Sequence, residues 1–304
     1  MIRYGVWVIY LVMLSTVKFK GTSARYNELD GCWHVFIDAG ANIGIHSRFL
    51  FEPEKFPNSK FSRIFDEYFG RDRDASTTCA VSFEPNPMHR AHHQSMADIY
   101  ADHGWRYWAI SSGIGARTGN MTFYSNLRRE SQYLKSSDKA LGVGFGISDR
   151  EGLNAENAYR QVIPQPKIIR PVVDFAEFRM KVANRRIPRV GSNRLPAVII
   201  KMDVEGAEFA VIPRLLKTRA RCDVNFISIE WHCSKKFLPY KVESSKGYHN
   251  HIESEAGARH VREALVRALE IQSQLPACAG HFKVSDIDDE AYWNYKSFEG
   301  LSKI

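Results

Sequence analysis

Three acidic residues each follow a short run of β-branched and aromatic residues, at points where the chain leaves what we expect to be buried strands. They are Asp38, Glu84 and Asp203. In an open parallel sheet, ligands bind where the carboxyl ends of the strands meet, near the switch in strand order. We therefore expect these three carboxylates to lie at the site where a ligand binds.

The segment after Asp38 joins a strand to a helix through Gly40, Ala41, Asn42 and, two residues later, Gly44. Glycine at position 40 would let the backbone approach a ligand, and glycine at position 44 would let the helix pack closely on the strand. The complete G-x-G-x-x-G pattern of dinucleotide folds is absent, and an acid before the loop would repel a pyrophosphate. Asp38 instead suits a cationic ligand that carries an amine or a sulfonium.

Glu84 ends a second strand, where a carboxylate can accept both hydroxyls of a ribose or can cap the following helix. The segment Lys201-Met-Asp-Val-Glu-Gly-Ala-Glu208 places Asp203 at a strand tip and Glu205 in the turn beyond it. Glu208 falls in the first turn of a helix, where we expect it to complement the helix dipole.

Histidine adds one candidate base, whereas cysteine adds no metal or redox motif. His232 follows a fifth strand, and its ordinary pKa near 6.5 suits a general base, although it could also pack at the strand end. Asp203, Glu205 and His232 could together hold a divalent ion, but no metal site is predicted. No C-x-x-C pair occurs among the five cysteines, and an odd number cannot pair completely. We expect Cys222 and Cys233 to be buried thiols.

Strands and helices that would position these side chains alternate along the chain. Strands are predicted at 33–38, 79–84, 105–110, 195–203 and 225–230, and helices at 43–51, 61–68, 88–103, 204–217 and 256–275. This alternation predicts an α/β fold with a doubly wound, mostly parallel sheet covered on both faces. An additional strand at 120–124 would contain the sequon Asn120-Met-Thr122, and a strand there argues against glycosylation.

Length and composition favour one globular domain over residues 25–304, with insertions at 52–78 and 125–168. Of the 304 residues, 44% are apolar and 25% are charged, which excludes a disordered tail, a collagen-like repeat and a polytopic membrane protein. The net charge of +8 is spread over scattered basic pairs, so we expect no nucleic-acid partner. Because of its length and its glycines, we expect the 125–168 insertion to be a mobile cover over the acceptor pocket.

The first 24 residues predict targeting to the secretory pathway. An apolar run at 4–14 follows Arg3, and small residues at 22–24 would suit a signal peptidase. The run is shorter than the roughly 20 residues that span a bilayer. A signal peptide is therefore predicted, with a short signal anchor that tethers the protein through residues 4–17 as the alternative. The protein would then be secreted or membrane-anchored; if the run is instead a buried element of the domain, the protein would be cytoplasmic.

Three segments together resemble the signature of the FkbM-type methyltransferases. They are Phe36-Ile-Asp-Ala-Gly-Ala-Asn-Ile-Gly44, Phe83-Glu-Pro-Asn-Pro87 and Ile200-Lys-Met-Asp-Val-Glu-Gly-Ala-Glu208. The resemblance runs from about residue 35 to residue 233. It implies a Rossmann-like fold of the class I methyltransferase type and dependence on S-adenosyl-L-methionine.

The resemblance also assigns roles to individual residues. Those that would bind the cofactor are Asp38, Gly40, Ala41, Asn42 and Gly44 for the methionine end, Glu84 for the ribose, and Ser111 and Ser112 for the adenine. Asp203 and Glu205 would line the methyl-transfer pocket. For a hydroxyl acceptor, Glu205, Asp203 or His232 would remove the proton.

We therefore expect an S-adenosyl-L-methionine-dependent methyltransferase that O-methylates a small hydroxylated or sugar-like acceptor. One alternative is a non-catalytic, secreted or membrane-tethered binding protein that retains the fold, because fold does not guarantee function. A second is a nicotinamide-dependent oxidoreductase, which the missing glycine and Asp38 disfavour. The sequence predicts neither the identity of the acceptor nor the oligomeric state.

Overall fold

A six-stranded sheet in the order β12-β9-β8-β1-β2-β3 forms the centre of the molecule, and every neighbouring pair in it is parallel. The computed structural model describes residues 27–125, 145–146, 167–189, 193–233, 240–243, 249–252, 254–275, 282–287 and 289. The strands are β1 (His34–Ala39), β2 (Thr78–Phe83), β3 (Arg106–Ile110), β8 (Val198–Met202), β9 (Phe226–Ile229) and β12 (Lys283–Ser285). The predicted α/β class and parallel sheet are confirmed, and β12 is an edge strand that the sequence did not predict.

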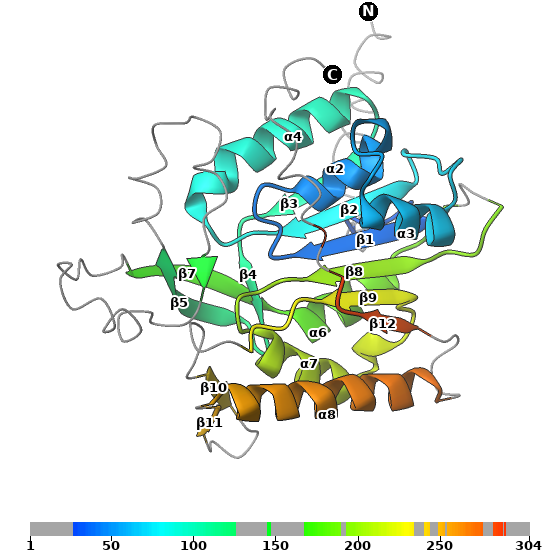
Figure 1. Cartoon of the computed structure of the whole chain (residues 1–304). Coiled ribbons are helices and arrows are strands. Elements are labelled where there is room, and N and C mark those ends of the chain that lie inside the picture. The colour runs from blue at the N-terminus through cyan, green and yellow to red at the C-terminus, as the bar shows by residue number, and fades with distance from the viewer. Residues whose placement is uncertain are drawn as a thin grey trace, which may run out of the picture.

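Helices cover both faces of this sheet (Figure 1). One face carries α2 (Ile45–Phe51), α3 (Lys60–Phe69) and α4 (Arg90–Asp102), and the other carries α6 (Phe175–Lys181), α7 (Glu208–Leu216) and α8 (Glu255–Ser273). Single turns of 3₁₀ helix are η1 (Pro53–Lys55), η2 (Pro87–His89), η4 (Ala183–Arg185) and η5 (Arg219–Arg221). None of the helices in the described part of the chain is long and apolar enough to span a membrane.

The alternating side chains of β1 show why both faces must be covered. Phe36 belongs to the apolar cluster beneath α2 and α3, and its ring centroid lies 4.9 Å from that of Phe65. Val35 and Ile37 point the opposite way, into the cluster that contains Phe175 and Val211. Because successive strand residues face opposite sides, an apolar run predicts a strand buried on both faces, as observed here.

A second, smaller sheet in the order β4-β7-β5-β6 lies beside the carboxyl edge of the central sheet (Figure 1). Its strands are β4 (Gly113–Gly115), β5 (Gly119–Ser125), β6 (Phe145–Gly146) and β7 (Lys167–Asp174), and β10 (Tyr240–Glu243) pairs separately with β11 (His249–Ile252). The predicted strand at 120–124 is therefore confirmed as β5. Most of the insertion predicted to cover a pocket, residues 126–144 and 147–166, lies outside the described residues.

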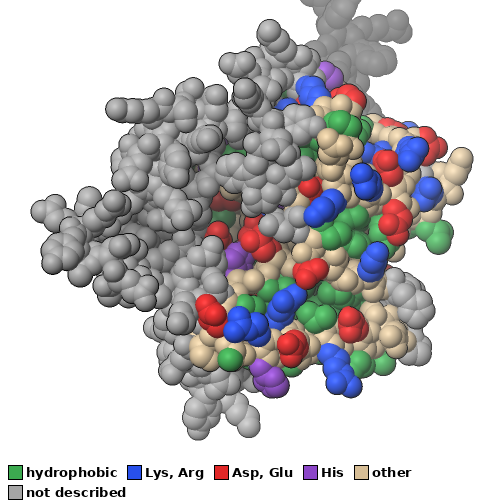
Figure 2. All heavy atoms as spheres, in the orientation of Figure 1, with side chains coloured by type: hydrophobic (Ala, Val, Ile, Leu, Met, Phe, Trp, Pro, Cys, Tyr) green, Lys and Arg blue, Asp and Glu red, His purple; other side chains and the backbone are tan. Residues whose placement is uncertain are grey.

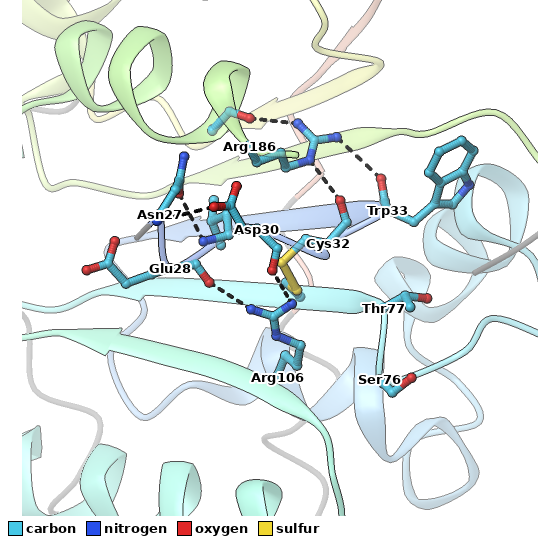
Figure 3. Close-up of a disulfide and its surroundings, with 12 residues drawn as sticks. Asn27, Glu28, Asp30, Cys32, Trp33, Ser76, Thr77, Arg106 and Arg186 are labelled. Atoms are coloured by element: carbon cyan, nitrogen blue, oxygen red, sulfur yellow. Dashed lines mark hydrogen bonds between the residues drawn. A yellow bond between two sulfur atoms is a disulfide. The ribbon is translucent and has the colours of Figure 1, made fainter. Parts of the chain in front are cut away.

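A disulfide between Cys32 and Cys79 ties β1 to β2 at their amino ends (Figure 3). Both cysteines are buried, and their Cα atoms are 5.7 Å apart. Two arginines hold the chain beside the bond: Arg186 Nε donates to the carbonyl of Cys32 over 3.0 Å, and Arg106 Nη1 donates to that of Asp30 over 2.7 Å. The bond therefore lies at the end of the sheet opposite the strand-end acids.

One of the two predictions for the remaining cysteines is wrong. Cys222 is disulfide-bonded, so the expectation that it is a buried thiol is wrong. Cys233 is a free, half-buried cysteine. Spacing rules identify pairs that are close in sequence, whereas the Cys32–Cys79 pair is separated by 47 residues and meets only because its strands are neighbours.

Replacing both Cys32 and Cys79 by alanine should lower the free energy of unfolding by about 4 kcal/mol, because the unfolded chain would no longer be closed into a loop. Urea unfolding under non-reducing conditions measures this change. The Cys233→Ala variant, which removes an unpaired thiol, is the control and should change stability far less. An unchanged unfolding midpoint in the double variant would contradict the stabilising role of the bond.

Candidate functional site

A cavity that is partly open to solvent lies at the carboxyl edge of the central sheet. Its lining comes from the loops after β1, β2 and β8 and from the small sheet: Gly40, Asn42, Glu84, Pro85, His89, Gly113, Ile114, Phe123, Asp203, Val204, Glu205 and Ala207. The structure thus brings Glu84, Asp203 and Glu205 together around one cavity.

Gly40 fixes the contact between the loops after β1 and β8. It has a φ of +81°, and a Cβ atom there would lie 1.7 Å from the backbone oxygen of Asp203. The amide of Asp203 also donates to the carbonyl of Ala39 over 2.8 Å. Glycine is therefore required for one loop to approach the other, whereas the sequence analysis expected it to admit a ligand.

The other loop residues assigned to the cofactor hold the backbone in place. The amides of Gly40 and Ala41 both donate to the carbonyl of Phe83 at 3.0 Å, which joins the ends of β1 and β2. Gly44 is the N-cap of α2, and a Cβ there would lie 3.1–3.2 Å from side-chain atoms of Met96 and His93. Met96 and His93 belong to α4, so glycine at position 44 lets the start of α2 pack on that helix, whereas the sequence analysis expected it to pack on the strand.

Glu84 is held in a fixed direction by two backbone amides. Its Oε2 accepts from the N–H of Asn42 and its Oε1 from the N–H of Asn86, both over 2.7 Å. Burial raises the pKa of Glu84 to about 8, although these two hydrogen bonds act to lower it. Each carboxylate oxygen keeps a further lone pair, so Glu84 can still accept hydrogen bonds from ligand hydroxyls.

Asp38 lies inside β1, and the cavity lining does not include it. The carboxylate is fully buried, and neither oxygen has a hydrogen-bond partner among the described residues. The nearest basic nitrogen is His46 Nδ1, 3.9 Å away. Burial raises the pKa of Asp38 to about 7. Asp38 therefore places an unpaired, titratable carboxyl group in the strand whose loop lines the cavity.

On the β8 side, His232 lies among several carboxylates. Its Nε2 is 3.4 Å from Asp203 Oδ1 and 3.9 Å from Glu205 Oε2, while its Nδ1 is 3.2 Å from Glu208 Oε1. Lys201 Nζ donates to the other oxygen of Asp203 over 2.9 Å. Figure 2 shows acidic side chains around a histidine near the centre of this face.

Glu208 has a larger role than the predicted interaction with the helix dipole. It begins α7 and is fully buried, and its carboxylate accepts from the backbone amides of Gly206 and His232, each over 2.9 Å. A carboxylate anchored in this way fixes the orientation of the imidazole, so that Nε2 faces Asp203 and Glu205.

The surrounding charges decide which of these groups can accept a proton. Burial acts to lower the pKa of His232, but the Glu208, Glu205 and Asp203 carboxylates outweigh it and raise the pKa to about 9. Burial acts to raise the pKa of Asp203, but Lys201 and His232 hold it below its ordinary value. At neutral pH His232 is therefore an imidazolium and Asp203 an ionised partner of two cations, which favours Glu205 as the base.

The backbone at Glu205 adopts a conformation that is rare for a residue with a side chain. Its φ is +52°, and Gly206 follows with a φ of +107°. A non-glycine residue in the left-handed region is strained, and such strain is concentrated at functional sites. This turn directs Glu205 to the cavity lining.

Asp203, Glu205 and His232 could hold a metal ion. Each offers one ligand atom, and these atoms lie within 4.8 Å of one another, the one such group among the residues that the structure describes. The sequence analysis identified the same three residues while predicting no metal site. Lys201 already neutralises part of the charge of this group.

His89 is a candidate site residue that the sequence analysis missed. Its side chain is buried and lines the cavity, and neither ring nitrogen has a hydrogen-bond partner in the described part of the chain. Burial lowers its pKa to about 4, so the ring is neutral and offers one donor and one acceptor. It lies within the predicted helix at 88–103, where no spacing marked it as different from other helical residues.

The two serines assigned to adenine lie in different surroundings. Ser111 lines a neighbouring hollow with Glu84, and its hydroxyl accepts from Arg170 Nη2 over 3.0 Å. Ser112 is buried and donates to the carbonyl of Pro171 over 2.8 Å, which fastens the small sheet. Of the pair, Ser111 is the one placed to contact a ligand beside Glu84.

Comparisons with known proteins identify a family for this chain. The profile of the Methyltransferase FkbM domain matches residues 38–259, a span that contains every strand-end acid described above. The crystal structure of the methyltransferase FkbM from Methylobacillus flagellatus KT aligns with a TM-score of 0.31 and 14% identity, over 71% of this chain and 36% of that one. The chain thus spans just over a third of that protein's length. No curated protein matches the sequence.

The Asp38→Asn variant should change how stability depends on pH. The pKa of Asp38 is about 7 in the folded protein, against an ordinary value of 3.8. The folded state thus binds this proton more tightly than the unfolded state does. Protonated Asp38 therefore contributes stability that is fully present below about pH 4 and is lost as the pH rises through about 7. The variant should gain stability relative to the wild type across that window, with no further gain above it.

Urea unfolding of both proteins at several pH values measures this difference, and the variant of an exposed acid, Asp102→Asn, is the control. Comparing differences across pH removes any constant effect of the buried amide. A difference that stays the same at every pH would show that Asp38 does not titrate in this range.

Proposed function

The chain belongs to the FkbM methyltransferase family, and we propose that this methyltransferase uses S-adenosyl-L-methionine to methylate a hydroxyl group of a small, sugar-like acceptor. The observation that carries the proposal is the cavity in which Glu84, anchored by two amides, lies across the β1 loop from Asp203 and Glu205. One side can bind the hydroxyls of a nucleoside, and the other side can bind an acceptor hydroxyl.

The polar groups of the site fit this cofactor. Three atoms of residues that line the cavity are buried without a hydrogen-bond partner among the described residues: Asn42 Oδ1 and both ring nitrogens of His89. An unsatisfied buried polar group costs about 1–3 kcal/mol, which a polar ligand would offset. Glu84 would hold the ribose and His89 the nucleoside, while Asn42 and its loop would hold the methionine end.

The charge of the site also suits a cation. Asp38 is unpaired beneath the β1 loop, and Asp203 and Glu205 line the cavity beside it. When bound, the cofactor supplies a methyl carbon that its sulfonium group activates toward attack. The acidic groups of this chain would favour that positive charge and keep it close to the acceptor.

Alignment and exclusion of water are the remaining tasks of the protein. Methyl transfer requires the attacking oxygen and the methyl carbon to be held in line, which orientation within a closed site achieves. Ile114, Phe123 and Val204 form an apolar wall of the cavity. This wall would exclude water from the position where the two reactants meet.

The acceptor hydroxyl must also lose its proton, and we assign this step to Glu205. The proton would move from the acceptor oxygen to a carboxylate oxygen of Glu205 as the oxygen attacks. Asp203 would orient the hydroxyl, since Lys201 and His232 keep it ionised. His232, protonated and held by Glu208, would balance the charge on Glu205 before transfer.

At a pH above about 8, where Glu84 is ionised, Glu84→Ala should weaken the binding of S-adenosylhomocysteine by about 1.5–3 kcal/mol, because charged hydrogen bonds to the ribose would be lost. Isothermal titration calorimetry measures the affinity, and Glu54→Ala, which removes an exposed carboxylate, is the matched control. An unchanged dissociation constant in a folded Glu84→Ala protein would exclude Glu84 from the cofactor site.

Glu205→Gln should keep its affinity for S-adenosylhomocysteine but slow turnover roughly 10²–10⁴-fold, the usual contribution of a positioned general base. Turnover is measured with an acceptor found by screening hydroxylated sugars against labelled S-adenosyl-L-methionine. Glu230→Gln is the matched control, since Glu230 Oε1 is 3.6 Å from His232 Nε2 but is not part of the cavity lining.

Two results would contradict this assignment. Full turnover in Glu205→Gln would exclude Glu205 as the base. Loss of S-adenosylhomocysteine binding in a folded variant would instead make Glu205 part of the cofactor pocket.

A further inference from the structure

We propose that Asn120 is a site of N-linked glycosylation and carries an oligosaccharide acquired in the secretory pathway. Asn120-Met121-Thr122 is the only Asn-x-Ser/Thr sequon in the 304 residues. Such a sequon is an acceptor where it lies on the surface of a secreted protein. The strand expected there is present as β5, and a strand was expected to argue against glycosylation. The position of Asn120 in the fold removes this objection.

Asn120 lies at the accessible start of β5. It is exposed, as are the three residues before it, and a Cβ atom added at Gly119 would meet nothing within 4 Å. In the described structure β6 pairs with β5 only at Tyr124 and Ser125, so Asn120 has a neighbouring strand on one side, where it is opposite Pro171 of β7. No described residue forms a hydrogen bond with its side-chain amide. The amide is therefore available for modification.

The direction of the strand places the sugar away from the cavity. Phe123 is buried and lines the cavity, and Met121 packs in the same small apolar cluster. Successive side chains of a strand point to opposite faces, so Asn120 and Thr122 lie on the other face of β5. An oligosaccharide on Asn120 would leave the cavity accessible.

The disulfides are independent support for the compartment that this modification requires. Cys32 is bonded to Cys79, and Cys222 is disulfide-bonded as well. Stable disulfides form in oxidising compartments such as the lumen of the endoplasmic reticulum. The apolar run at 4–14, predicted as a signal peptide or a short anchor, would bring the chain there. Neither observation depends on the proposed methyl transfer.

The modification is a transfer from a lipid-linked oligosaccharide diphosphate. Asn120 Nδ2 forms a bond to C1 of the first sugar, while the bond from C1 to the phosphate oxygen breaks and its electron pair leaves with the lipid diphosphate. The amide proton is released to the medium. Thr122 supplies the hydroxyl that the sequon requires at its third position.

The test is expression of the full chain, with its own amino-terminal residues, in eukaryotic cells, followed by treatment with peptide N-glycosidase F. The wild-type protein should gain mobility on a denaturing gel, and mass spectrometry should find Asn120 converted to Asp. Asn120→Gln and Thr122→Val should both abolish the shift. Thr122→Ser keeps the sequon and should keep the shift, as should Asn193→Gln, which alters an exposed asparagine outside any sequon.

Several outcomes would overturn the proposal. They are a wild-type protein that the glycosidase does not shift, a shift that persists in Asn120→Gln, and a shift that Thr122→Ser abolishes. Binding of S-adenosylhomocysteine by Asn120→Gln should equal that of the wild type, which also shows that the variant folds. Loss of cofactor binding in every protein, wild type included, would count against the proposed function and leave the glycosylation result intact.

Discussion

The site depends on the backbone contact between Gly40 and Asp203, because this contact sets the distance between the loops after β1 and β8. A methyl group at position 40 would overlap the Asp203 carbonyl, so the two loops can meet only if that residue is glycine. The Ala39 carbonyl accepts a hydrogen bond from the Asp203 amide, and the Phe83 carbonyl accepts hydrogen bonds from the amides of Gly40 and Ala41. Three adjacent strand ends are thereby joined by main-chain bonds. The acidic side chains lie around the cavity because the backbone beneath them is fixed.

The two acids that follow β8 and line the cavity, Asp203 and Glu205, each lie within 4 Å of a basic side chain. Lys201 pairs with Asp203, and His232 faces Asp203 and Glu205 while Glu208 holds its other nitrogen. Burying a charge without a partner is costly, so several acids in one short segment require such compensation. Asp38 lacks such compensation, since it is fully buried and has no hydrogen-bond partner in the described structure. The pKa of Asp38 is raised because burial outweighs the attraction of Lys201. A cationic ligand bound above Asp38 would lower this pKa.

Local patterns in the sequence predicted the strands of the central sheet but not the contacts between residues that are far apart in the chain. The apolar runs before Asp38, Glu84 and Asp203 predicted three of the parallel strands, and strand ends must meet at one edge of a sheet. The pairing of Glu208 with His232 joins residues 24 positions apart, and no spacing rule relates a helix start to the end of the next strand. His89 was missed for a similar reason, since what distinguishes it is burial without a hydrogen-bond partner among the described residues. The Cys32–Cys79 bond likewise depends on which strands become neighbours.

The two ends of the central sheet differ in the groups that they hold, and β1 contributes to both ends. At the amino end, Cys32 is covalently joined to β2, and Arg186 holds the adjacent backbone. At the carboxyl end, the chain contains a strained Glu205 and a buried Asp38 without a hydrogen-bond partner among the described residues, features that cost stability. Unfavourable local conformations persist only where the surrounding structure enforces them. At the carboxyl end, the main-chain bonds that join the strand ends hold the buried acid and the strained turn in the positions that the proposed binding and proton removal would use.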